Sequence, residues 1–167
     1  MRFATIGALG LILAATSFGQ TTNPAKLKFN GIGLYSTLAQ VKKALGKPKM
    51  DGKPTREECI GAREKEVEYD GASFWFMDGD SKDGKTFEVK AFTVTSPKYV
   101  VSGIKVGDTE LNVRRRLGTK FTKTDDDETP GGTVWSYEFP ETGDPGFTTI
   151  YISRGKVTQI SSAHMVC

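Results

Sequence analysis

The sequence predicts an α+β protein made of two tandem repeats, each a short helical segment packed on a three- to four-stranded antiparallel meander. Two observations predict this class. Residues 31–46 align without gaps on residues 103–118, with glycine, isoleucine, threonine, valine, leucine and glycine recurring in register. The rest of each unit is rich in aromatic and β-branched residues separated by turn formers, which is typical of antiparallel strands. The expected order is therefore a helix followed by strands, twice.

The N-terminus has the form of a secretory signal peptide over residues 1–19. Arg2 precedes an apolar stretch from Ile6 to Ala15 that is too short to span a bilayer, and small residues follow at Ser17 and Gly19. We expect cleavage after Gly19, with an uncleaved anchor or a cut after Ala15 as alternatives. The mature protein would then be exported, either to the periplasm or to the medium.

The net charge limits the class of partner, and the cysteines are considered together with the expected compartment. Lys and Arg number 23 against 20 Asp and Glu. A nucleic-acid binder would carry a basic excess on one face, so we expect no nucleic-acid partner. Disulfides persist in exported proteins, and we expect Cys59 and Cys167 to be bonded, with two free thiols as the alternative.

The first repeat unit is expected over residues 20–102 and the second over residues 103–167. Each aligned segment predicts a short helix that a side chain caps at its start. The candidate caps are Ser36 or Thr37 in the first unit and Asp108 or Thr109 in the second. Gly46 and Gly118 can take the left-handed conformation that ends a helix.

Each helix carries a narrow apolar stripe, and the first has a reinforced start. The stripe consists of Leu38, Val41 and Leu45 in the first helix and of Val113 and Leu117 in the second. Thr37 and Gln40 have the spacing of a capping box, which the second helix lacks. Helices of about two turns do not persist alone, so each stripe should pack on a sheet.

The strongest strand signal is a hairpin that turns at Asp70-Gly71. The implied register pairs Tyr69 with Ala72, Val67 with Phe74, and Lys65 with Phe76. Val67, Tyr69, Phe74 and Phe76 then share one sheet face, and Trp75 and Met77 point to the other. A third strand is expected over residues 86–95.

In the second unit, strands are expected over residues 133–139, 148–153 and 156–163, with Arg154-Gly155 turning the last hairpin. The segment 74–76 matches 150–152, and the apolar pair Val89 and Phe92 matches Val157 and Ile160. Both pairs change parity along the strand, which predicts a β-bulge in each unit.

The pattern Gly-Ile-x-x-x-x-Thr-x-x-x-Val-x-x-x-Leu-Gly, present twice and each time followed by a meander, resembles the β-lactamase-inhibitor-protein family and the small outer-membrane assembly lipoproteins. The resemblance covers about residues 27–167. No cysteine follows the signal for lipid attachment, and one cysteine lies in each unit where the inhibitor family usually has a pair. The resemblance therefore implies an architecture and no particular target.

In the inhibitor-like proteins the sheet face turned away from the helices contacts the partner through aromatic side chains. The residues that match this placement are Trp75 and Tyr151, with Met77 and Phe147 as weaker members. A slip of one residue in the hairpin register would instead place Trp75 in the core. We expect an exported, non-enzymatic protein-binding module, inhibitor-like or envelope-assembly-like.

The alternative is a thiol-dependent enzyme in which Cys59 is the nucleophile and His164, the only histidine, is its base. This requires the disulfide to be absent. No cofactor or metal is expected, because the acidic loop 78–84 lacks the spacing of a calcium site. The basic pairs Lys42-Lys43 and Arg114-Arg115 favour at most a weak contact with a membrane surface.

Overall fold

The computed structural model describes residues 26–56, 58, 61–79, 85–119, 121–126, 132–138 and 146–164. The predicted signal peptide, both cysteines and most of the loop 78–84 lie outside the described residues. The cleavage site and the Cys59–Cys167 bond therefore stay predictions.

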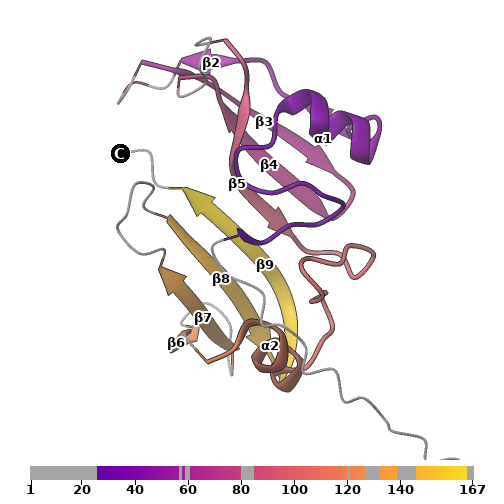
Figure 1. Cartoon of the computed structure of the whole chain (residues 1–167), viewed down its shortest axis with the longest axis vertical. Coiled ribbons are helices and arrows are strands. Elements are labelled where there is room, and N and C mark those ends of the chain that lie inside the picture. Colours follow the sequence, from indigo (N-terminus) through magenta and orange to yellow (C-terminus); the bar gives the residue numbers. More distant parts are fainter. Residues whose placement is uncertain are drawn as a thin grey trace, which may run out of the picture.

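The described residues form an α+β fold with two helices and one antiparallel sheet, shown in Figure 1, which agrees with the predicted class. The elements are α1 (Leu38–Leu45), β1 (Met50–Asp51), β2 (Thr55–Arg56), β3 (Arg63–Tyr69), β4 (Ala72–Met77), β5 (Glu88–Val94), α2 (Glu110–Leu117), β6 (Thr122–Asp126), β7 (Gly132–Glu138), β8 (Gly146–Ser153) and β9 (Lys156–His164). The strand order is β1-β3-β4-β5-β9-β8-β7-β6, and β2 also pairs with β3.

The N-terminal half of the sheet, β1 to β5, joins the C-terminal half, β6 to β9, where β5 pairs with β9. The pairing runs from Ala91 opposite Ala163 to Val94 opposite Ile160. In Figure 1 α1 lies beside the strands of the N-terminal half and α2 lies beside those of the C-terminal half. The strands of both halves therefore form one continuous surface.

Both helices begin and end where local chemistry predicts. The side chains of Thr37 and Thr109 each accept a hydrogen bond from the backbone N–H three residues on, so threonine is the cap in both helices. The Gln40 side chain accepts from the Thr37 N–H at 2.8 Å and completes the capping box of α1. Gly46 and Gly118 end the helices with φ near 79° and 78°.

The predicted hairpin register and bulges are confirmed. Tyr69 pairs with Ala72, Val67 with Phe74, and Lys65 with Phe76. The pairing shifts between Trp75 and Phe76 in one half and between Tyr151 and Ile152 in the other. The extra residue of each bulge is Lys90 on β5 and Thr158 on β9.

Both helices cover the same face of the sheet. Directly paired residues share a face, and one row connects β3 to β7 through Tyr69, Ala72, Val94, Ile160, Ile150 and Trp135. At one end of this row Tyr69 Oη donates to the Gly46 carbonyl at the end of α1. At the other end the Arg114 guanidinium of α2 lies over the Trp135 ring.

The hydrophobic core lies between the helices and this face. Val41 of α1 and Val113 and Leu117 of α2 are buried, and Leu38 and Leu45 pack against the core from its edge, as the apolar stripes predict. The Phe29 ring stacks on Phe74 with centroids 5.6 Å apart. Burial of each such side chain contributes about 1.5–3 kcal/mol, which is what stabilises two helices too short to persist alone.

The segments that precede the helices have the same local backbone in both halves. Phe29 bridges to Ile32 and Val101 bridges to Ile104, each across a two-residue turn with positive φ at both central residues. Each helix cap also bridges to the start of the last strand of its half, Thr37 to Glu88 and Thr109 to Lys156. These bridges fix each helix to its own set of strands.

Candidate partner-binding face

The sheet face opposite the helices, here called the helix-free face, carries an aromatic row across four strands. Trp75 on β4 pairs with Ala91 on β5, Ala91 pairs with Ala163 on β9, and Ala163 pairs with Phe147 on β8. At the usual spacing between strands the two aromatic residues stand about 14 Å apart along this row. The Phe147 side chain is 36% exposed and Trp75 is half-buried.

The neighbouring row on the same face consists of short hydroxyl side chains. Ser73 pairs with Thr93, Thr93 with Ser161, and Ser161 with Thr149. Short side chains leave the sheet backbone close to any molecule that lies against it. In these two rows the rings of Trp75 and Phe147 are the only large side chains, and the residues between them are short. One ring lies on each side of the β5–β9 pairing.

One margin of the helix-free face is acidic. Glu64, Glu66 and Glu68 alternate along β3 and pair with Met77, Trp75 and Ser73 respectively, so their side chains belong to this face. Glu64 Oε2 accepts a hydrogen bond from Trp75 Nε1 at 2.9 Å. This bond holds the indole in one orientation, while the Glu66 carboxylate next to it is exposed.

The structure brings three of the four predicted contact residues to the helix-free face in accessible form. Trp75 and Phe147 share one row, and Tyr151, which pairs with Gln159 on β9, is half-buried on the same face. The prediction is wrong for Met77, whose side chain is only 1% exposed.

Next to Met77, hydrogen bonds between Arg63 and Asp78 join the adjoining ends of β3 and β4. Arg63 donates to Asp78 through its backbone N–H and through Nε, both at 2.7 Å, and the Asp78 N–H donates back to the Arg63 carbonyl. Burial raises the pKa of Asp78, but these hydrogen bonds outweigh it and hold the pKa below its ordinary value. Alternation along a strand predicts the face on which a side chain lies, and does not predict how much of that side chain solvent reaches.

A polar cluster at the β5–β9 junction was not anticipated from the sequence. The bulge residue Lys90 is 1% exposed, and its Nζ lies 4.8 Å from the centre of the Tyr35 ring. Tyr35 Oη lies 3.0 Å from Nδ1 of His164. Tyr35 has φ of 64°, an uncommon value for a bulky residue, at the position that aligns with Gly107. The alignment of the bulky Tyr35 with Gly107 is the feature of the sequence that could have indicated this cluster.

His164, the proposed base of the thiol alternative, is thus in contact with a tyrosine at the end of β9. Cys59 lies outside the described residues, so the Cys59–His164 pairing stays untested. Among the residues that the structure describes, no group of three or more His, Cys, Asp or Glu side chains is arranged to hold a metal ion.

Comparison with known proteins gives little similarity. No family model and no curated protein matches the sequence. A solved structure with limited similarity is that of an extracellular protein containing a SCP domain from Bacillus anthracis str. Ames, with a TM-score of 0.44 and 9% identity. The match covers 95% of this chain and 50% of that one, so the chain spans about half the length of that protein. Within the described ranges, the helices are too short to cross a membrane.

Proposed function

We propose that this chain is an exported, non-enzymatic protein-binding module, built of two copies of one helix-and-meander unit, whose helix-free face binds a protein partner. The observation that carries the proposal is the row Trp75, Ala91, Ala163 and Phe147, which runs from one half of the sheet to the other. An inhibitor-like role and an envelope-assembly role fit this surface equally.

Agreement between the two halves supports the origin in two copies. The tight turns before the helices, the threonine caps, the bridges from the caps to the last strand and the single bulge in that strand all recur. The bulge lies opposite the same pair of positions in each half, Trp75–Phe76 and Tyr151–Ile152. Bulges are specific features of a fold, and their recurrence at aligned positions favours duplication over coincidence.

The chemistry of the helix-free face favours a protein as the ligand. Tryptophan and other aromatic residues are enriched where protein interfaces derive most of their affinity, because they bury a large area with few rotatable bonds. The acidic margin on β3, with Glu66 exposed, favours a partner that carries basic side chains beside its apolar contact. The apolar segment at residues 6–15, in the form of a secretory signal, supports an exported location.

The proposal is tested by capturing the partner from a cell-envelope fraction with the chain from residue 20 onward and then measuring affinities of variants. Trp75→Ala and Phe147→Ala should each raise the Kd by about 30-fold, the loss typical of a central aromatic contact. Both should leave the melting temperature close to that of the unaltered protein, because neither ring belongs to the main core cluster.

Leu111→Ala is the matched control, because Leu111 is an exposed apolar side chain on α2, which covers the opposite face. It should leave the Kd unchanged. Affinities that are insensitive to Trp75→Ala and Phe147→Ala, or that fall with Leu111→Ala alone, would contradict the proposal.

A further inference from the structure

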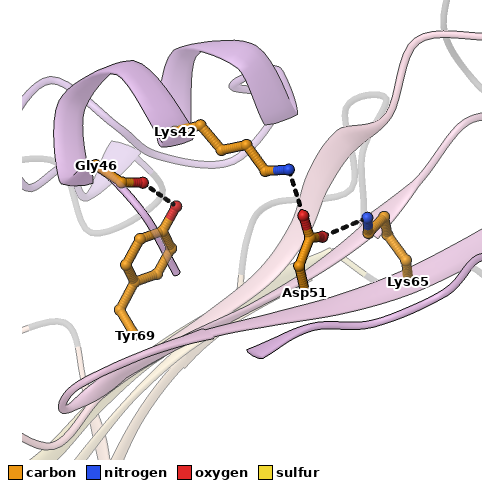
Figure 2. Close-up of polar contacts among 5 residues, drawn as sticks. All are labelled: Lys42, Gly46, Asp51, Lys65 and Tyr69. Atoms are coloured by element: carbon orange, nitrogen blue, oxygen red, sulfur yellow. Dashed lines mark hydrogen bonds and ion pairs between the residues drawn. The ribbon is translucent and has the colours of Figure 1, made fainter. Parts of the chain in front are cut away.

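In the N-terminal half a carboxylate connects helix to sheet on the helix-covered side. Asp51 on β1 accepts from Lys42 of α1 and from Lys65 of β3, both at 2.5 Å, as Figure 2 shows. The hydrogen bond from Lys42, followed by that from Lys65, holds the pKa of Asp51 below its ordinary value. The carboxylate thus lies between two cations and remains ionised.

The matching place in the C-terminal half has the opposite charge. Asp51 pairs with Val67 on β3, and Lys123 pairs with Trp135 on β7 in the same relation to the sheet. Arg114 of α2 stands where Lys42 stands in the gap-free alignment, and the same offset of 72 residues places Lys123 where Asp51 stands. The cation on the helix is therefore kept, while the carboxylate that it would contact is replaced by a second cation.

A pocket lies at this place, with a volume of about 100 Å³. It is lined by Arg114, Thr119, Phe121, Lys123 and Trp135, and we call it the Trp135 pocket. Trp135 is 3% exposed, and within the described part of the chain its Nε1 has no hydrogen-bond acceptor. Buried donors without an acceptor are rare in folded proteins because their loss of hydration is uncompensated.

The charges around the pocket are partly balanced. Glu110 of α2 contacts Arg114 at 3.1 Å and Lys123 at the longer distance of 3.8 Å. One carboxylate therefore faces two cations, and the Arg114 and Lys123 side chains are still 51% and 49% exposed. Among the described side chains at the pocket, Glu110, Arg114 and Lys123 together carry one net positive charge.

We propose that the Trp135 pocket binds a carboxylate group of a ligand, with Trp135 Nε1, Arg114 and Lys123 as the donors. The bound group would occupy the position that the Asp51 carboxylate holds in the N-terminal half. The Asp51 carboxylate, bound between two cations at the matching place in the N-terminal half, favours a carboxylate as the bound group. The pocket lies on the helix-covered side, so this inference is independent of the helix-free face, and either can fail alone.

The two indole N–H groups provide a test with an internal reference. The ¹⁵N-labelled chain is titrated with sodium acetate and, separately, with acetyl-Gly-Gly bearing a free C-terminal carboxylate, at constant ionic strength set with chloride. The Trp135 indole signal should move and saturate, because its N–H gains an acceptor. The Trp75 signal should stay in place, because its N–H already donates to Glu64. Trp75→Phe assigns the two signals.

Variants at the pocket margin separate binding from folding. Arg114→Gln changes a half-exposed side chain and should weaken acetate binding about tenfold, the usual loss for one charged hydrogen bond. Glu110→Gln should tighten binding, because it removes the competing carboxylate. Saturation by acetate supports a site for free acids, and saturation by the dipeptide alone supports a site for a chain terminus. No shift of the Trp135 signal with either, or an equal shift with the amidated dipeptide, would overturn the proposal.

Discussion

At the scale of single residues, matched positions in the two halves carry different charges and therefore different chemistry. Asp51 connects α1 to the sheet through Lys42 and Lys65, whereas Lys123 at the aligned position faces a pocket beside Trp135. The backbone pairing is the same in both places, since β1 pairs with β3 as β6 pairs with β7. Opposite charges at this place thus accompany an ion-paired carboxylate in one half and an open basic pocket in the other.

The ion pairs of Asp51 predict a pH-dependent loss of stability in Asp51→Asn. At neutral pH the variant should lose about 1 kcal/mol of unfolding free energy, a modest value because the carboxylate is 37% exposed. The pKa of Asp51 is lowered in the folded protein, so its contribution is present above the unfolded pKa of about 3.9. It is lost as the pH falls through the lower folded pKa.

Urea unfolding from pH 7 down to pH 2 measures this dependence. The difference between Asp51→Asn and the unaltered protein should shrink below pH 4. Glu66→Gln removes an exposed carboxylate from the neighbouring strand β3 and controls for the change in net charge. A difference that stays constant across the whole pH range would show that Asp51 does not act through its charge.

Residue by residue, the sequence predicts which face a side chain takes better than whether solvent reaches it. Trp75 was placed correctly because the Asp70-Gly71 turn fixes the register of its hairpin. Met77 has the same parity as Trp75, yet its side chain is only 1% exposed. Trp135 carried no local signal, since its pocket depends on α2 and β6 packing against β7.

At the scale of elements, the two hairpin glycines differ in their surroundings. Gly71 and Gly155 have φ of 76° and 71°, a region that L side chains rarely adopt. A Cβ added at Gly71 would lie 2.2 Å from the Cβ of Ser96, whereas one at Gly155 would meet nothing within 4 Å. The β3–β4 turn is therefore packed against the chain that follows β5, and the β8–β9 turn is open.

This difference predicts unequal costs for the same substitution. Gly155→Ala should cost about 1 kcal/mol from backbone strain alone, and Gly71→Ala about 3 kcal/mol from strain and overpacking together. Chemical denaturation of the two variants measures both costs, and Gly155→Ala serves as the control for the backbone conformation. Equal losses would show that the contact with Ser96 relaxes without cost.

Elements with strong local signals were predicted, and elements that depend on a partner strand were not. Both helices follow from threonine caps, terminal glycines and an apolar stripe, all of which act within the segment itself. The edge strands β1, β2 and β6 were missed. The first two have two residues each, and β6 reads Thr-Lys-Thr-Asp-Asp without apolar alternation. Such strands form because a longer neighbouring strand provides backbone hydrogen-bond partners along its edge.

At the scale of the whole molecule, the pairing of β5 with β9 decides what surface the protein presents. It joins residues far apart in the sequence, Ala91 with Ala163, and no local pattern predicts which edges of two meanders will meet. Without that pairing Trp75 and Phe147 would lie on separate sheets. With it they lie on one helix-free face, which the proposed function requires.

The most direct test of the proposed function is hydroxyl-radical footprinting of the protein alone and in complex with its captured partner. We predict that oxidation of Trp75 and Phe147 falls in the complex, while oxidation of Leu111 and Tyr35, both exposed on the helix-covered side, is unchanged. Protection of Leu111 and Tyr35 with Trp75 and Phe147 oxidised as in the free protein would contradict the assignment of the binding face.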